Sequence, residues 1–554
     1  MLSAWLRELS DYMLTKIEIQ RESCDSRMIF AEFGGMKMDI VATRSLCIYL
    51  SAMVLAASLL VGCVANTPYR TTAGPCSTPN CEIGSIEDHP VTADPSISYL
   101  LGIVEFDDQG AKHIPAQMDA LFTRLEAESA DQDLCITVFV HGWEHNAAFH
   151  DTNVDEFRAL LETLALTERE HGTALHGKPR KAVGIYASWR GKSIDGDLFP
   201  LTFWGRKDAA ERVAKGSVRE LLGRARALRD TLNRKTWSGK LLQAGAPLPR
   251  GETLRSTRLL TIGHSFGGLI VYSALAQYYT DRAAAAMMST ALGDARDEDK
   301  AISAYGDLVV IVNPAVEAMS WEPIRQIVEG RTATAFSRGQ KPVFVEVTST
   351  ADNATGIAFP LGRSVSTMGE SFTNGDELAE ARTAFGHYER FLTHDLTSRP
   401  EAATPEWQAV SPDRLKLDTP QQAADAFKSL VHSECIARAK FEEKWRRDGY
   451  LQPGWTRQFS AGAVLSHRKE SGKEGAFDPN DPFWIVSADA SVISSHSDIS
   501  RPVFVDFVRQ LYDDLLPDDA VCKTERAGRG TATEAHRQLR VVNDRVNSRV
   551  RQRE

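Results

Sequence analysis

Seven short apolar runs, separated by longer amphipathic stretches, constrain the fold of this chain more than any other feature. Each run has four to eight residues, and most are rich in Val and Ile, which is typical of strands buried on both faces. The runs are Tyr99–Phe106, Leu134–Val140, Ala182–Ala187, Leu259–Ile262, Leu308–Val312, Val343–Val347 and Phe483–Ser487. Strands that alternate with helices predict an α/β fold, with a mostly parallel sheet flanked by helices.

Helical patterns occupy the stretches between these runs, for example over Val154–Leu166, Val213–Leu232 and Gly267–Tyr279. Runs and helices together predict one α/β domain over residues 97–516. An insertion of about 130 residues, at about 353–481, separates the last two predicted strands. Ordinary connections have only several residues, so the insertion is expected to form a subdomain or a lid before the last strand.

The composition is that of an ordinary globular protein. The chain has 554 residues, of which 43% are hydrophobic and 25% charged, and this excludes collagen-like, coiled-coil and wholly disordered chains. Eight cysteines are too few for a disulfide scaffold. The formal net charge of −10 provides no positive field that would attract nucleic acid, so we expect no nucleic-acid partner.

An apolar segment near the N-terminus, Leu46–Val61, has about the length of a signal-peptide core and is shorter than a membrane-spanning helix. Lys37 and Arg44 precede it, and Gly62 and Cys63 follow it. Positive charge, apolar core, small residue and cysteine in this order resemble a bacterial lipobox. A plain transmembrane anchor, or a cysteine present by chance, is the alternative.

The lipobox resemblance implies that residues 1–62 comprise an N-terminal extension and a signal peptide, and that Cys63 carries a lipid anchor. Met36 or Met38 is the expected start, so residues 1–35 do not contribute to the predicted fold. Val64, rather than an acidic residue, follows Cys63. By resemblance to Gram-negative lipoproteins, this implies an outer-membrane protein that faces the periplasm.

Both flanks of the predicted domain have the composition of non-globular segments. Residues 63–96 are rich in Thr, Pro, Ser and Asn without apolar periodicity, which predicts a flexible tether. Cys76 and Cys81 within it either close a small loop in an oxidising compartment or remain free thiols. Residues 517–554 are basic and contain few large apolar side chains, so we expect a solvated tail.

A G-x-S-x-G motif, GHSFG, occupies the segment from Gly263 to Gly267. The apolar run Leu259–Ile262 leads directly into it, and the helical pattern Gly267–Tyr279 leads out. A tight turn between strand and helix would expose the Ser265 hydroxyl above the sheet and aim the positive helix N-terminus at the reacting centre. The motif therefore predicts a nucleophile, and the alternative is a glycine-rich turn with an incidental serine.

The strand–GHSFGG–helix unit resembles the α/β-hydrolase superfamily, particularly its serine esterases and lipases. The resemblance covers roughly residues 97–360 and 480–516, and not the tether, the insertion or the tail. It implies an α/β-hydrolase fold and a triad that cleaves a small-molecule or lipid ester, with no cofactor and no metal. An acyltransferase or thioesterase on the same triad, and a non-catalytic envelope interaction protein, are the alternatives.

The resemblance also implies an oxyanion hole, a pair of donors aimed at the oxygen that becomes negative during acyl transfer. The first donor is the backbone N–H of Phe266, the residue after the nucleophile. The second is the backbone N–H of Trp143, because an HGW segment beginning at His141 follows a strand as the oxyanion loop of lipases does. A competing interpretation is metal binding by His141, His145 and His150.

The triad partners should follow the serine in the order acid, then histidine. Asp352 is the first carboxylate after the sixth predicted strand, so it is the expected acid, with a turn or helix-capping role as the alternative. His496 lies between the last predicted strand and an amphipathic closing helix, so it is the expected base for Ser265. His394 and His387, both inside the insertion, are the other candidates.

Overall fold

The computed structural model describes residues 64–76, 81–176, 179–193, 202–242, 252, 254–291, 300–329, 336–337, 340–410, 419–448, 455–468 and 480–515. The chain divides into two compact units, Met1–Ala65 with Ser193–Pro200, and Asn66–Lys192 with Leu201–Glu554. All elements named below belong to the second unit. The signal-like segment, Cys63 and the basic tail lie outside the described residues.

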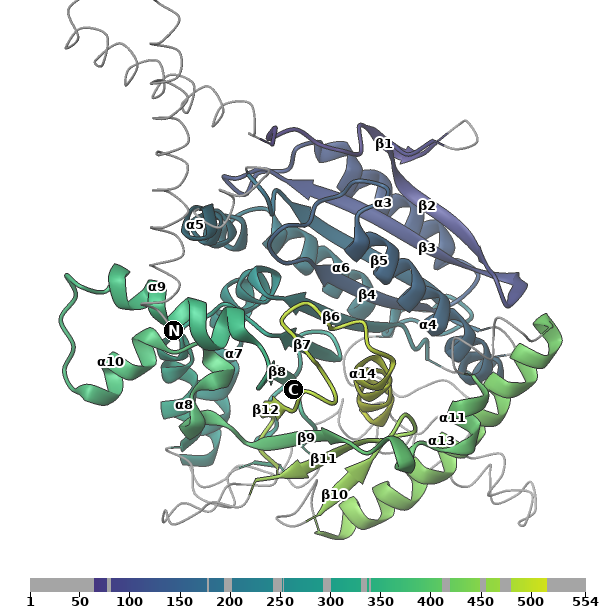
Figure 1. Cartoon of the computed structure of the whole chain (residues 1–554). Coiled ribbons are helices and arrows are strands. Elements are labelled where there is room, and N and C mark those ends of the chain that lie inside the picture. The colour runs from purple at the N-terminus through teal and green to yellow at the C-terminus, as the bar shows by residue number, and fades with distance from the viewer. Residues whose placement is uncertain are drawn as a thin grey trace, which may run out of the picture. The chain divides into compact units, whose positions relative to one another are not determined.

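A mostly parallel sheet of twelve strands forms the centre of the second unit (Figure 1). In spatial order the strands are β1 (Thr72–Pro75), β2 (Gly84–Val91), β3 (Asp94–Phe106), β5 (Lys181–Trp189), β4 (Leu134–Val140), β6 (Arg258–His264), β7 (Leu308–Val312), β8 (Phe344–Ser349), β12 (Phe483–Ala488), β9 (His394–Ser398), β11 (Ala463–His467) and β10 (Thr456–Gln458). Neighbours from β3 to β9 are all parallel. The predicted α/β architecture is confirmed, and each of the seven predicted runs overlaps a strand.

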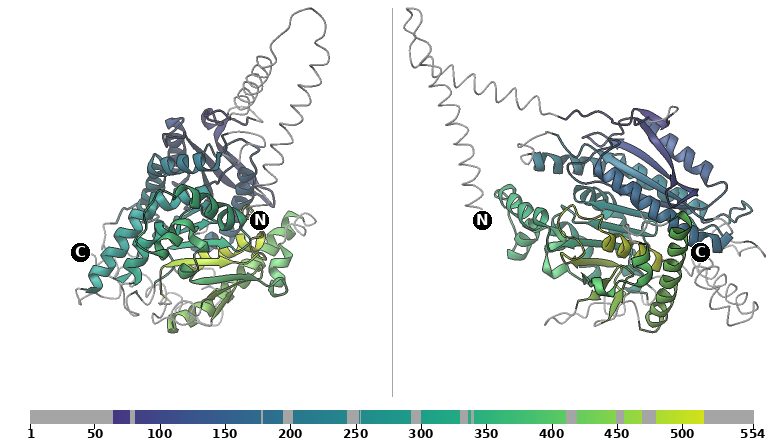
Figure 2. Two further views of the ribbon diagram at one scale, coloured as in Figure 1. Left: turned by 60° about the vertical axis from the view of Figure 1, so that its left-hand side comes forward. Right: turned by 45° about the vertical axis from the view of Figure 1, so that its right-hand side comes forward.

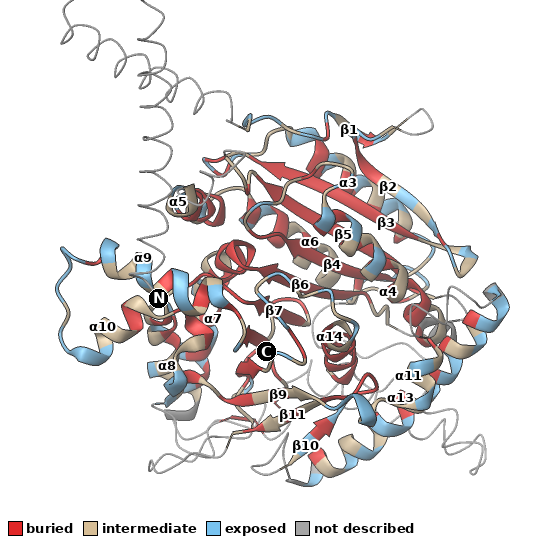
Figure 3. Cartoon of the chain, viewed as in Figure 1, coloured by how far each residue is buried: buried red, intermediate tan, exposed pale blue. Residues whose placement is uncertain are grey.

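Helices cover both faces of the sheet, because successive side chains of its strands point to opposite sides and both sides are apolar (Figure 2). One face carries α3 (Pro115–Glu128), α5 (Phe203–Lys215), α6 (Val218–Leu232), α7 (Phe266–Ala291) and α8 (Glu322–Glu329). The other carries α4 (Thr152–His176), α11 (Pro405–Ala409), α13 (Pro420–Asp448) and α14 (Pro502–Asp514). Figure 3 shows that the central strands are buried along most of their length.

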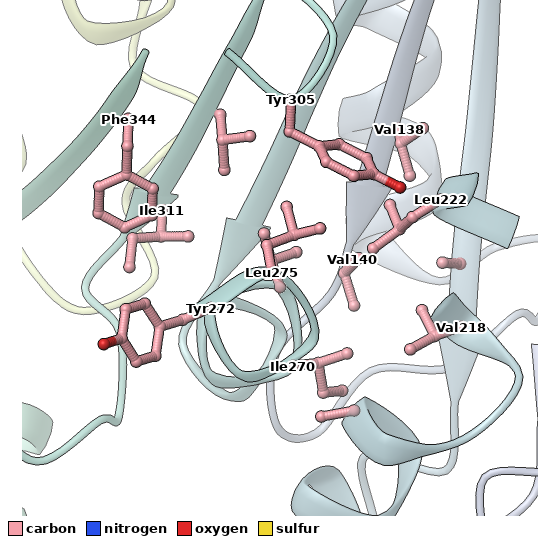
Figure 4. Packing of buried hydrophobic residues seen from close by; sticks show 14 of the residues in the cluster. Val138, Val140, Val218, Leu222, Ile270, Tyr272, Leu275, Tyr305, Ile311 and Phe344 are labelled. Atoms are coloured by element: carbon pink, nitrogen blue, oxygen red, sulfur yellow. The ribbon is translucent and has the colours of Figure 1, made fainter. Parts of the chain in front are cut away.

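The helix α7, which leaves the GHSFG turn, packs its apolar side chains on the middle of the sheet (Figure 4). Ile270 is fully buried, and the Tyr272 ring lies 6.1 Å from the ring of Phe344 on β8. Burial of each large apolar side chain stabilises the fold by roughly 1.5–3 kcal/mol. This packing fixes the position of the turn that precedes the helix.

The predicted insertion extends the central sheet as well as supplying helices. β8 and β12 pair directly in parallel register, from Phe344↔Phe483 to Ser349↔Ala488. β9, from within the insertion, pairs with the other side of β12, and β11 and β10 continue that edge. The expectation of a separate subdomain or lid is therefore wrong for these three strands. They escape detection because β9 is short and only alternately buried.

The prediction of a flexible tether over residues 63–96 is wrong for its described part. β1 and β2 belong to the sheet, and β2 pairs antiparallel with β3. Arg70 just before them is fully buried, donates from Nε to the carbonyl of Ala147 at 2.7 Å, and pairs with Glu87 at 2.9 Å. Strand pairing and buried ion pairs hold this segment in place, and neither leaves an apolar periodicity in the sequence.

Two further details of the chain differ from, or complete, the sequence prediction. Cys76 and Cys81, between β1 and β2, form a disulfide, so the loop is closed. The helix predicted over Val213–Leu232 is broken between α5 and α6. The break occurs at Gly216, where a Cβ would lie 2.3 Å from the carbonyl oxygen of Gly110.

Candidate active site

Ser265 occupies the sharp turn between β6 and α7, in a backbone conformation that few residues adopt. Its φ is +57°, in the left-handed region that L-residues avoid. The turn is held by a hydrogen bond of 2.9 Å from the Ser265 N–H to the carbonyl of Val312. At Gly267 a Cβ would lie 1.9 Å from the carbonyl oxygen of Val140, so only glycine lets the turn pass the end of β4.

The three residues predicted as a triad form one hydrogen-bonded line. His496 Nε2 lies 2.8 Å from Ser265 Oγ, and His496 Nδ1 lies 2.8 Å from Asp352 Oδ2. The carboxylate can only accept, so Nδ1 carries the proton and Nε2 is left to accept from the serine hydroxyl. The imidazole is 23% exposed and the Asp352 side chain fully buried, so the line runs from the interior toward solvent.

Asp352 lies three residues after the end of β8 and two residues before the π-helix η4 (Ala354–Ala358). Besides His496, its carboxylate accepts from the N–H groups of Ala354 at 2.8 Å and Thr355 at 3.1 Å, and from the Thr355 hydroxyl. Burial alone would raise the pKa of Asp352, but the hydrogen bonds from His496 and Thr355 outweigh it and hold that pKa below its ordinary value. The aspartate therefore stays ionised, and it caps the turn at the same time.

The backbone of His496 is fixed by two side chains that sequence reasoning missed. Its carbonyl oxygen accepts from His264 Nε2 and from Asn313 Nδ2, each at 2.8 Å. Burial lowers the pKa of His264 to about 3, with the neighbouring His496 adding to the effect, so His264 is neutral and donates its one N–H. His264 is the first variable residue of the GHSFG motif, and Asn313 directly follows β7.

The predicted oxyanion residues flank Ser265 on both sides. Phe266 is the first residue of α7, and the first N–H groups of a helix lack acceptors within the helix. A Cβ on Gly142 would lie 2.8 Å from the Ser265 Cβ, so the backbone leading into Trp143 passes directly beside the serine. The Phe203 ring lies 5.2 Å from that of Trp143 and 4.8 Å from that of Phe266, which packs the two neighbours of the serine against one aromatic side chain.

The loop that contains Trp143 is tied to the end of the adjacent strand β5. The Glu144 N–H donates to the carbonyl of Gly191 at 3.3 Å, and the Gly191 N–H donates to the carbonyl of His145 at 3.1 Å. Glu144 has a φ of +75°, so the chain reverses sharply here. A rigid loop is what a preorganised pair of backbone donors requires.

The three clustered histidines do not share a ligand position. His141 donates from Nδ1 to the Gly142 carbonyl at 2.8 Å, and burial lowers its pKa to about 4. His145 Nδ1 lies 3.1 Å from Asp151, whereas His150 is exposed, 3.5 Å from Glu82. Among the described residues, no group of three His, Cys, Asp or Glu is arranged to hold a metal ion. The metal interpretation therefore has no geometric support.

The two alternative bases lie elsewhere. His394 is the first residue of β9, where it is buried with its ring 4.4 Å from that of Trp484 and 5.1 Å from that of His467. His387 lies nearer the site, with Nε2 3.0 Å from Thr355 Oγ1, and so reaches Asp352 only through that hydroxyl. Of the three candidate histidines, only His496 contacts Ser265.

Comparison with known proteins gives this chain no relatives: no family model, no curated protein and no solved structure matches it. Within the described part of the chain, no helix is both long enough and apolar enough to cross a bilayer.

Proposed function

We propose that the chain is a serine hydrolase of the α/β-hydrolase type that cleaves carboxylic esters. The observation that carries the proposal is the line in which His496 lies 2.8 Å from both Ser265 and Asp352. The three residues follow the carboxyl ends of β6, β8 and β12, and they occur in the order serine, acid, histidine that this superfamily uses. The left-handed φ of Ser265 supports the same assignment.

The reaction follows from the roles that this geometry allows. His496 Nε2 takes the hydroxyl proton as Ser265 Oγ attacks the ester carbonyl, while Asp352 keeps the imidazole in the required tautomer. The backbone N–H groups of Phe266 and Trp143 stabilise the oxyanion. His496 then protonates the departing alcohol, and water hydrolyses the acyl-enzyme by the same sequence of proton transfers.

A series of p-nitrophenyl esters, tested on the wild-type protein and on Ser265→Ala, examines this proposal. The expected result is hydrolysis by the wild type and a loss on the order of 10⁴-fold or more in the variant. A fluorophosphonate probe should label the wild type and not Ser265→Ala, whereas a non-catalytic interaction protein would not react. Wild-type rates in Ser265→Ala would refute the assignment.

We further propose that the protein is anchored in the bacterial envelope through Cys63. The support is the order of positive charge, apolar core, small residue and cysteine at its N-terminus. Two lipid signals anchor a protein stably, so mass spectrometry of the mature N-terminus should find a diacylated or triacylated Cys63. An unmodified N-terminus upstream of Cys63 would contradict the proposal.

A further inference from the structure

An elongated apolar slot, separate from the triad, lies between α4 and α14 on the face of the sheet opposite α7. Its volume is about 310 Å³, at the lower end of the range for small-molecule sites. Its floor includes Phe139, Ile262 and Val312 from three neighbouring strands. Trp407 and Phe427, both from the insertion, also line it. Ser265, Asp352 and His496 do not line it.

Residues from about three turns of each of two helices line the slot. On α4 the lining extends from Asn153 to Leu164, and on α14 from Pro502 to Tyr512. Eleven residues of helix rise about 16 Å, and the walls are apolar over most of that length. A long, narrow, apolar space of this kind fits an unbranched hydrocarbon chain better than a compact or polar ligand.

One end of the slot carries hydrogen-bond acceptors. Asn153 is 6% exposed, and its Oδ1 has no hydrogen-bond partner among the described residues, which is costly for a buried polar atom. Its Nδ2 donates to Glu156 Oε2 at 3.3 Å, and Ser500 Oγ donates to Glu156 Oε1 at 3.1 Å. The unused group at this end is therefore an acceptor beside a carboxylate, which suits a ligand that donates a hydrogen bond.

The cation that lines the slot does not favour an anionic ligand. Arg509 donates to Glu434 Oε2 at 2.8 Å and to Asp506 Oδ1 at 2.7 Å. Two carboxylates thus more than balance its charge, and Glu156 would repel the carboxylate of an anionic ligand. We propose that the slot binds an aliphatic chain that ends in a hydrogen-bond donor, with a primary alcohol as the simplest case, the alcohol group on Asn153 Oδ1 and the chain between α4 and α14.

Titration of the full protein with a series of n-alkan-1-ols tests the proposal. Affinity should rise roughly fourfold per added methylene and stop rising at about twelve heavy atoms, since a cavity of 150 Å³ already holds benzene. Decanoate at pH 7 should bind more weakly than decan-1-ol, and decylamine at least as tightly as the alcohol. No saturable alcohol binding, or preference for the carboxylate, would overturn the proposal.

Variants assign the binding to the slot. Val505→Trp, on the half-buried face of α14, should weaken decan-1-ol binding by tenfold or more, and Leu160→Trp on α4 gives a second obstruction should the first variant fail to fold. Val365→Trp, a side chain 69% exposed outside the slot, is the matched control and should bind as the wild type does. Equal binding by all folded variants would place the ligand elsewhere.

The polar end has its own test. Asn153→Leu should weaken the binding of decan-1-ol about three- to tenfold, which is the contribution of one hydrogen bond. The affinity for the methyl ether of decan-1-ol, which has no donor, should not change. An equal loss of affinity for both ligands would mean that Asn153 shapes the slot without accepting a hydrogen bond. The assignment of the polar end would then fail.

Discussion

The side chain of Asn313 donates a hydrogen bond of 2.8 Å to the backbone carbonyl of His496, across 183 residues of sequence. The same side chain accepts from the Ser349 N–H at 2.8 Å, and the Asn313 N–H donates to Val347 at 2.8 Å. One residue at the end of β7 thus connects the end of β8, where Asp352 follows, to the loop that presents the imidazole. Its φ of +46° is one that asparagine tolerates better than most residues.

We predict that Asn313→Gly lowers kcat/KM for a short ester by about ten- to a hundredfold, the effect of a misplacement near 1 Å. Glycine keeps the left-handed φ, so the loss reports the missing hydrogen bonds and not backbone strain. Steady-state kinetics on one p-nitrophenyl ester measures it, with the unfolding midpoint as control. Unchanged kcat/KM in a folded variant would show that the Asn313 contact does not position His496.

The three candidate histidines should separate clearly in kinetics. His496→Ala should lose nearly as much kcat/KM as Ser265→Ala, because triad members act as a unit. His394→Ala should keep activity near the wild-type level, since the side chain is buried in β9 beside Trp484. Loss of activity in His394→Ala with a normal unfolding midpoint would contradict the assignment of His496 as the base.

His387→Ala tests the second layer around the acid. His387 contacts Thr355, which donates to Asp352, so the change should reduce kcat a few-fold without abolishing it. Thr355→Val removes the same connection from its other end and should have a similar effect. If the double variant is no worse than either single variant, the two residues act through one path.

The strands and the turn that contains Ser265 could be predicted from sequence because each carries a local signal. A buried parallel strand is a continuous apolar run, and the serine turn needs glycines at fixed spacing around Ser265. Asp352 and His496 then follow from position, since parallel strands bring their carboxyl ends to one edge of the sheet. The order of the strands places these ends together across 231 residues of sequence.

The strands β1, β2 and β9 and the role of Asn313 could not be predicted, because they depend on strand pairing and polar contacts and not on apolar periodicity. β1, at the edge of the sheet, and β2 beside it are held by backbone pairing and by Arg70, whose ion pair with Glu87 has no sequence signature. β9 alternates buried and half-buried residues over five positions, too short for a pattern. The role of Asn313 becomes visible only from its φ and its three hydrogen-bond partners. Its position directly after a strand is the one feature of the sequence that could have indicated this role.

Glu346 gives a prediction about pH and stability. It lies on β8 with its side chain fully buried, and it accepts a hydrogen bond from the Thr348 hydroxyl. Burial, with a contribution from the charge of Asp352, raises the pKa of Glu346 from 4.5 to about 8. The native state therefore holds a proton that the unfolded chain releases, and the resulting stabilisation is full below about pH 4.5 and is lost as the pH rises toward 8.

Glu346→Gln should remove that pH dependence, because the amide has the shape of the protonated acid and cannot ionise. Between pH 6 and 9 the free energy of unfolding should fall less in the variant than in the wild type. The two falls should differ by on the order of a few kcal/mol over this range. Urea unfolding at several pH values measures the slope. The control is Glu377→Gln on α10 (Gly375–Arg382), which should follow the wild type, because hydrogen bonds from Thr373 lower the pKa of Glu377 and keep it ionised over this range. Equal slopes for wild type and Glu346→Gln would mean that Glu346 is ionised in the native protein. A buried carboxylate would then lie near Asp352 with no cation in the described part of the chain to balance it.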